Sequence, residues 1–366
     1  MAEEKTPIPI KNLFFLLCYA WDVLAISNAI SVSEEECDNA LNLLARLFSF
    51  GVSKLIRSGF HRSYIKKTED TSSPRGKILL RESLEDLATH NGHLVCEFDE
   101  YSQNDVFNGI IVYTIDKLIH TQGLEGRIRQ ALRKHLVFFD GIDSVQPTKD
   151  NRRRIVFNRN NVTYKLLLSI AFMLYDNTSV NEDDGYNTFR DFFREEQMSK
   201  VFEKFILNFY ACNLPRDRYR VHAPKINWHI SEEAQSEWGD IFDIDTNPGD
   251  RRTDIVVEDN KTNTQIIMDA KYYEKTFVKA YMDSNEEKIR TSHLNQVRGY
   301  VLDSEYQGSK IGVLVYPMVV NDLNKGKMFP IKGSHIIVKT INLADDWRNI
   351  EKDMLGFVSK FEKKGA

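Results

Sequence analysis

The sequence predicts an α/β fold of the mixed α+β type, built in two parts. Three observations support this prediction. Apolar strands alternate with amphipathic helices in the second half, the first half is mostly helical with a few short strands, and the polar segment Asp176–Asn187 separates them. We therefore predict an N-terminal helical and small-β region over residues 1–175 and a second domain with a mixed central sheet over residues 190–366.

Composition excludes several protein classes. The chain has 366 residues, of which 42% are hydrophobic and 28% charged, as in a soluble globular protein. Its net charge of −4 shows no overall basic excess, so a nucleic-acid surface would have to be local. The four cysteines are scattered without C-x-x-C spacing, and the apolar run Leu13–Trp21 is too short to span a bilayer. We therefore expect a cytoplasmic protein without a membrane span.

The first half should contain helices and a few short strands. Apolar spacing predicts helices over residues 8–26, 34–50, 52–59, 105–119 and 162–174, and short strands over residues 63–65, 76–80 and 97–101. Arg75 and Lys77 lie in the loop and strand that follow the polar segment Lys67–Pro74. Such loop-borne cations contact a phosphate or a protein partner in some proteins, and a solvated hairpin tip is the ordinary alternative.

A basic segment follows in the first half. Residues 127–159 contain nine Lys or Arg against three Asp, and Arg152, Arg153 and Arg154 are consecutive. This excess suits contact with a nucleic-acid phosphate backbone, so these three arginines are candidate DNA-binding residues. A solvated charged face is the competing interpretation.

The second half alternates helices and strands. Helical spacing predicts helices over residues 195–213, 288–303 and 347–361, and apolar runs predict strands over residues 221–230, 310–317 and 335–341. Glu203 lies off the apolar stripe of the first of these helices, and the second presents Gln296. Glu203 is a candidate site acid, although an ordinary charge on the outer face of the helix explains it as well.

A β-hairpin between these helices carries the candidate active site. Its strands, Thr253–Val257 and Gln265–Asp269, flank a polar turn, and this register places Asp254 opposite Asp269. Side chains alternate along a strand, so Lys271 shares a face with Asp269. Carboxylates suit Mg²⁺, and a lysine beside the ion can orient a water, which is the arrangement for phosphodiester hydrolysis. A surface ion pair at the end of a hairpin is the alternative.

Several blocks of this sequence resemble one family. TDIVV followed by IIMDAKYY resembles the PD-(D/E)xK nuclease motif in the form found in the McrC family. IPIKNLFFLLCYAW, RGKI, FDEYSQNDVFNGII, MSKVFEKF and GVLVYP resemble further blocks of that family in the same order, so the likeness covers nearly the whole chain. The resemblance implies a restriction-endonuclease-like C-terminal core preceded by a partner-binding region.

The resemblance also implies roles for the hairpin residues. Asp254 and Asp269 would hold Mg²⁺, or Mn²⁺ in its place, together with the backbone carbonyl of Ala270. Lys271 would serve the attacking water. Thr253 stands where the name of the motif has proline, which is a frequent variation.

Two residues outside the hairpin are secondary candidates. Gln296 matches a glutamine that often assists this kind of site, and Glu203 matches an acid that the family does not always keep. Both would act beside the two aspartates.

The family resemblance implies a partner as well. McrC-like subunits work with McrB, an AAA+ GTPase that forms a hexameric ring, and their N-terminal half inserts into the ring and stimulates GTP hydrolysis. This chain has no G-x-x-x-x-G-K-[ST] phosphate loop, so GTP would enter only through the partner. Arg75 and Lys77 would then face the ring, and a double-strand break would require two copies, through dimerisation or paired complexes.

Three functions therefore remain in view. The first is a Mg²⁺-dependent type IV restriction endonuclease subunit that cleaves DNA containing modified cytosine. The second is a non-catalytic activator of a AAA+ GTPase ring, and the third is a nuclease of the same fold that acts on other nucleic acids. An Asp254→Ala variant separates the first two, because it would lose cleavage and keep GTPase stimulation.

Overall fold

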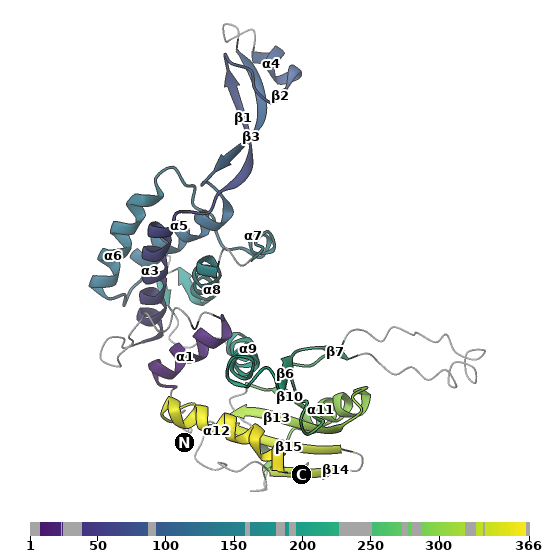
Figure 1. The fold of residues 1–366 in the computed structure, drawn as a ribbon. Helices are drawn as coiled ribbons and strands as arrows, with labels where there is room; N and C mark the ends of the chain where they lie inside the picture. The colour runs from purple at the N-terminus through teal and green to yellow at the C-terminus, as the bar shows by residue number, and fades with distance from the viewer. Residues whose placement is uncertain are drawn as a thin grey trace, which may run out of the picture. The chain divides into compact units, whose positions relative to one another are not determined.

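The protein divides into two compact units in this computed structural model (Figure 1). The structure describes residues 8–22, 24, 39–86, 93–157, 162–180, 187–189, 195–226, 251–272, 277–279, 287–318, 327–331 and 334–363. The first unit, here called the sheet unit, comprises Met1–Glu36 and Phe193–Ala366. The second, called the stalk unit, comprises Cys37–Phe192.

This division differs from the predicted one at the N-terminus. Helix α1 (Ile10–Ala20) packs against α9 (Glu195–Asn213) in the sheet unit instead of joining the predicted region 1–175. The Asn12 amide donates hydrogen bonds of 2.8 and 2.7 Å to two backbone carbonyls just before the last helix, and the Phe15 ring stacks on Trp347 at 4.7 Å. The apolar face of α1 therefore completes the core of a unit that is otherwise encoded far along the chain.

The stalk unit contains a helical part. Its helices are α3 (Ala40–Ser58), α5 (Val106–Ile119), α6 (Gly126–Leu136), α7 (Lys149–Arg153) and α8 (Val162–Asn177), with a 3₁₀ turn η2 (Val137–Phe139) after α6. The two predicted helices over residues 34–50 and 52–59 form the single helix α3. It starts at Asn39, whose side chain accepts a hydrogen bond from the Asn42 backbone, and ends before Gly59 at a φ of 91°.

A three-stranded sheet forms the stalk itself, and Figure 1 shows it extending from the helical part of this unit. Strand β1 (Ser63–Thr71) pairs antiparallel with β3 (Leu94–Ser102), and β2 (Lys77–Ile78) pairs with the other edge of β3. The predicted short strands 63–65 and 97–101 are thus each nine residues long in the structure. Gly76 adopts a φ of 72°, and a Cβ there would lie 2.4 Å from a backbone oxygen of β3, so only glycine fits the turn.

Smaller elements complete the stalk unit. Helix α4 (Leu80–Asp86) follows β2, and β4 (Thr178–Val180) pairs with β5 (Asn187–Phe189). Sequence patterns predicted neither α4 nor α6.

The sheet unit is built on a mixed six-stranded sheet, which confirms the predicted fold class. Its strands, in spatial order, are β14 (Lys327–Ile331), β15 (Ser334–Ile341), β13 (Ser309–Pro317), β10 (Thr264–Ala270), β9 (Ile255–Asp259) and β6 (Tyr219–His222). The pairs β10–β13 and β13–β15 are parallel, and the other pairs are antiparallel. Every residue of β10 is buried, so the second strand of the hairpin is a central strand.

The remaining elements of the sheet unit are helices and two small ladders. The helices are α9, α11 (Thr291–Asp303) and α12 (Trp347–Ser359), followed by the 3₁₀ turn η4 (Lys360–Lys363). The ladders pair β7 (Lys225–Ile226) with β8 (Arg251–Arg252) and β11 (Phe277–Lys279) with β12 (Glu287–Ile289). Among the described residues, no helix combines the length and apolar character needed to cross a bilayer.

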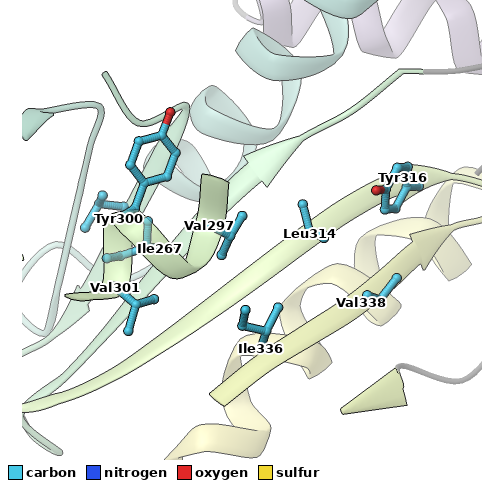
Figure 2. Close-up of a cluster of buried hydrophobic side chains, with 9 residues drawn as sticks. Ile267, Val297, Tyr300, Val301, Leu314, Tyr316, Ile336 and Val338 are labelled. Carbon is cyan, nitrogen blue, oxygen red and sulfur yellow. The ribbon is translucent and has the colours of Figure 1, made fainter. Parts of the chain in front are cut away.

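Helix α11 is held on the sheet by an apolar cluster (Figure 2). Val297 and Val301 of α11 lie beside Leu314 of β13 and Ile336 of β15, and all four are buried. Gly312 permits this close approach, because a Cβ there would lie 2.5 Å from a Val297 methyl. Each buried aliphatic side chain contributes about 1.5–3 kcal/mol, so the docking of α11 is firmly set.

Candidate functional site

The hairpin register agrees with the predicted one. Ile255 of β9 pairs with Met268 of β10, and one further step places Asp254 opposite Asp269. Asp254 itself lies just before β9, where the backbone ladder has ended. Its Oδ2 instead accepts a hydrogen bond of 2.9 Å from the backbone N–H of Ala270. The Asp254 side chain thus takes the place of a backbone acceptor beyond the last pair of the β9–β10 ladder.

Asp269 is the most buried member of the site. Its side chain is 1% exposed, and the Nζ of Lys271 lies 3.1 Å from its Oδ1 and 2.9 Å from its Oδ2. The backbone N–H of Lys271 donates to the Val315 carbonyl of β13 at 2.8 Å, which fixes the residue beside the sheet. As predicted from strand alternation, Asp269 and Lys271 share a face.

Burial and mutual repulsion disfavour the charged forms of the two carboxyl groups. Burial raises the pKa of Asp269 to about 7, the nearby Asp254 adds to the rise, and Lys271 opposes it. Burial also raises the pKa of Asp254, against the lowering effects of the Ala270 N–H and Lys271. Two buried carboxylates with one ammonium leave negative charge that is not balanced, so the site favours a further cation.

The donor set fits a magnesium-type ion. The Oδ2 of Asp269 is buried beside the Lys271 ammonium at 2.9 Å, and a carboxylate oxygen has two lone pairs, so it can bind a further ligand as well. No group of three His, Cys, Asp or Glu side chains gathers closely enough to hold a metal within the part of the chain that the structure describes. Mg²⁺ ordinarily binds through one or two carboxylates and keeps several waters, so Asp254 and Asp269 suffice as side-chain ligands.

Glu203 lies within electrostatic reach of the aspartates. It is half-buried on α9, where its Oε1 accepts a hydrogen bond of 3.3 Å from Ser199. Burial raises the pKa of Glu203, and the charge of Asp254 raises it further. The structure therefore brings this secondary candidate near the hairpin as a third acidic group, without making it part of a three-carboxylate cluster.

Gln296 reaches the site through a neighbour. Its amide donates a hydrogen bond of 2.8 Å to the Tyr300 hydroxyl, and that hydroxyl donates to the Arg252 carbonyl at 3.1 Å. Burial raises the pKa of Tyr300, and the charges of Asp269 and Asp254 also raise it. The hydroxyl of Tyr300 thus lies within the field of both carboxylates.

Sequence reasoning missed Tyr300 and His293. His293 is buried on α11, its Nδ1 lies 2.8 Å from the Tyr316 hydroxyl, and burial followed by the Lys271 charge lowers its pKa. A usable signal existed, because His293, Gln296 and Tyr300 recur at helical spacing after the Asp-x-Lys triplet. They form the face of α11 that is directed to the site.

The arginine triplet is not a single surface. Arg152 forms two hydrogen bonds with Asp176, at 3.0 and 2.6 Å, and a third with the Pro147 carbonyl. Arg153 lies 3.5 Å from Asp150, and Arg154 is exposed. The Arg152 guanidinium therefore joins two helices of the stalk unit, because its planar fork matches a carboxylate.

Arg75 and Lys77 lie on the stalk, both exposed. The Arg75 guanidinium covers the Phe98 ring at 3.8 Å and donates to Glu69 at 2.7 Å, while Lys77 lies in β2. The predicted contact with a GTPase ring stays a prediction for both.

One family model matches most of this chain. The family described as "McrBC 5-methylcytosine restriction system component" matches residues 3–317. The "Type IV methyl-directed restriction enzyme EcoKMcrBC" of Escherichia coli K12 is 26% identical over 364 residues, which is 98% of this chain and all of that protein. Two solved assemblies from Thermococcus gammatolerans are also similar. They are an assembly of McrB AAA+ hexamers with bound McrC (18% identity, 97% of this chain and 77% of that chain, TM-score 0.49) and the McrBC complex (21% identity, 57% and 59%, TM-score 0.39). With the matched region covering most of its length, this chain belongs to the family of McrBC 5-methylcytosine restriction system components.

Proposed function

We propose that this chain is the nuclease subunit of such a system and hydrolyses phosphodiester bonds of DNA that contains modified cytosine. One observation carries the proposal: the buried Asp269, the partly buried Asp254 and a lysine meet at the open end of a central hairpin in a member of a restriction family. Asp254 and Asp269 share the charge of the Lys271 ammonium, which lies 2.9 Å from the Oδ2 of Asp269, and this excess of carboxylate supports a metal-dependent reaction over a plain ion pair.

Asp254, Asp269 and the backbone carbonyl of Ala270 would hold Mg²⁺, or Mn²⁺ in its place. The N–H of Ala270 is directed to Asp254, and the carbonyl of a strand residue points to the same side as its N–H, which supports this assignment. The bound ion supplies positive charge against the phosphate oxygens.

The other residues of the site would position the water. Lys271 is held beside Asp269 by its backbone and its ammonium, so it can donate a hydrogen bond that aligns the attacking water, and its positive charge stabilises the hydroxide that develops. Tyr300 would keep Gln296 and the strand before Asp254 in place. Glu203 adds acidic charge that draws a cation to this end of the sheet.

We further propose that an McrB-like AAA+ GTPase hexamer controls cleavage. The matched family is a component of a larger system, and this chain carries no phosphate-binding loop, so GTP would act only through the partner. Cleavage of both DNA strands would use two copies of the chain, through dimerisation or paired complexes, in the cytoplasm.

The proposal is tested by Lys271→Ala in the complex reconstituted with the GTPase partner. Cleavage of a methylated plasmid should fall by about a hundredfold or more, because the group that aligns the water is lost. Lys261→Ala is the matched control, since Lys261 is exposed in the turn of the same hairpin. Normal cleavage by Lys271→Ala would overturn the assignment.

A purely activating role is the second candidate, favoured by the long exposed stalk. Asp254→Ala separates the two. The nuclease proposal expects lost cleavage with GTPase stimulation kept, whereas an activator without nuclease function would show no cleavage even in the wild-type complex. Duplex, single-stranded and RNA substrates, with and without methylation, decide the substrate class.

A further inference from the structure

Helix α6 presents an unusual outer face. Ile128 and Leu132 are buried on one side, where α6 packs against α3 and α5. On the other side, Arg127 and Lys134 are exposed two turns apart on one stripe of the helix, and Phe138 is exposed in the 3₁₀ turn η2 that follows. Figure 1 shows α6 at the border of the helical part of the stalk unit, beside α3.

The cations of this face are not used by the fold. Arg129, on the inner side, donates to the Thr121 carbonyl at 2.9 Å. Arg127, Arg133 and Lys134 are exposed, and no ion pair or hydrogen bond joins their side chains to other residues that the structure describes. The cations of α6 are therefore available to bind a ligand, whereas Arg152 and Arg153 already have carboxylate partners.

Exposed apolar side chains adjoin these cations. In the 3₁₀ turn after α6, Phe139 is buried and contacts the Phe60 ring at 4.6 Å, whereas Val137 and Phe138 are 75% and 58% exposed. A large aromatic side chain exposed to water next to unpaired arginines is a typical composition of a binding surface. We call Arg127, Gln130, Arg133, Lys134 and Phe138 the α6 surface.

We propose that the α6 surface binds the phosphate backbone of the DNA substrate. The step from Arg127 to Lys134 covers about 10 Å of helix, so the cations reach successive phosphates of one strand. Gln130 adds an amide donor between them, and Phe138 can pack on a sugar or an unpaired base. In a chain of net charge −4, a local patch is what polyanion binding requires. This inference rests on the proposed nuclease function and gives it a second DNA contact, in a different unit from the hairpin.

Charge reversal of the α6 surface tests the proposal. The triple variant Arg127→Glu, Arg133→Glu and Lys134→Glu should weaken binding of the full-length chain to a methylated 30-base-pair duplex by about tenfold or more in metal-free buffer. The slope of log affinity against log salt should become shallower by about 3, near one unit for each phosphate that the variant no longer neutralises. Fluorescence anisotropy over a salt series measures both, and the unfolding temperature checks that the fold is intact.

A control of equal charge comes from the same unit. The triple variant Arg57→Glu, Lys66→Glu and Lys149→Glu also reverses three exposed cations, and it should leave the affinity and the slope close to wild type. Phe138→Ala should lower the affinity a few-fold without changing the slope, and Phe138→Trp should restore it.

The possible failures are distinguishable. If the wild-type complex cleaves DNA and the α6 variant keeps normal affinity and slope, the α6 assignment is overturned and the nuclease proposal stands. If the variant binds DNA normally but no longer stimulates the GTPase partner, the surface belongs to a protein interface and the inference is again overturned. If the wild-type chain does not bind DNA and the wild-type complex does not cleave it, both proposals fall.

Discussion

The hairpin has a buried aspartate at each end, and the surroundings of the two aspartates shift their pKa values in opposite directions. At the closed end, Asp259 accepts four hydrogen bonds, two from Arg218 and one each from Thr262 and the Lys261 backbone, at 2.7–2.9 Å. At the open end, the Lys271 ammonium lies 3.1 Å from the Oδ1 and 2.9 Å from the Oδ2 of Asp269. Arg218 lowers the pKa of Asp259 to about 2, whereas burial raises that of Asp269 to about 7. A carboxylate with four hydrogen bonds closes the turn, whereas a carboxylate held by one ammonium remains able to bind a further ligand.

We expect the largest effect on cleavage from a substitution at the open end of the hairpin. Asp269→Asn keeps the size of the side chain and removes its charge, so metal affinity and cleavage by the complex should fall by at least about a hundredfold. Thermal stability of the metal-free protein should stay the same or rise, because a costly buried charge is gone. Cleavage assays and unfolding curves measure the two effects. A variant that unfolds early would show that Asp269 holds the fold together.

The next largest effect is expected on stability, from a substitution at the closed end of the hairpin. Asp259→Asn removes the partner of Arg218 and should lower the free energy of unfolding by about 2 kcal/mol, with cleavage retained below the unfolding temperature. Urea unfolding of this variant and of Asp269→Asn, side by side, gives the comparison. Equal stability losses in both variants would contradict the contrast between the two ends.

The two aspartates also predict opposite pH dependences. The folded-state pKa of Asp269 is raised above its ordinary 3.8, so the folded state binds more protons than the unfolded one between about pH 4 and 7. Its contribution therefore destabilises the metal-free protein increasingly as pH rises through that window. The lowered pKa of Asp259 gives stability that is present above about pH 4 and lost as pH falls toward 2.

Added Mg²⁺ should sharpen this contrast. The ion should raise the unfolding temperature more at pH 7.5 than at pH 5, because protons compete for Asp269 at the lower pH. Asp269→Asn should show neither the fall between pH 4 and 7 nor the Mg²⁺ effect. An unchanged pH profile in this variant would remove Asp269 as the cause.

The smallest expected effect concerns Tyr300. Tyr300→Phe removes the hydroxyl that joins Gln296 to the Arg252 carbonyl. The hydrogen bonds lost contribute about 1 kcal/mol to holding these groups in place. Single-turnover cleavage should slow by about two- to tenfold with DNA affinity unchanged. Tyr306→Phe, in the loop after the same helix, is the control. Weaker DNA binding without slower cleavage would assign Tyr300 to substrate binding instead.

Local patterns predicted much of the sheet unit. Strand alternation and a symmetrical turn were enough for the register that places Asp254 opposite Asp269, and α9 has the predicted bounds because its apolar stripe is regular. The approach of Tyr300 and His293 could not be predicted in the same way. It depends on how closely α11 docks on the sheet, and that distance is set by Gly312, far from both residues in sequence.

The stalk unit was harder to predict. The segment that contains α6 was interpreted by its charge alone, because only Ile128 and Leu132 mark its buried face. The pairing of β1 with β3 joins segments that β2 and α4 separate along the chain, so the strand lengths were underestimated. The partner of Arg152 is Asp176, 24 residues away, which no local pattern indicates.

The position of α1 has a consequence for how the chain is made. On the ribosome this helix appears long before α9 and α12, yet its stacking partner Trp347 belongs to α12. At about 5–20 residues per second, α1 waits roughly 15–70 seconds for Trp347, although α9 is synthesised earlier in that interval. The stalk unit can fold in this interval, because all of its residues are synthesised after α1 and before α9. A fragment beginning at residue 190 would expose the surfaces that α1 covers, so we expect such a fragment to aggregate where the full chain does not.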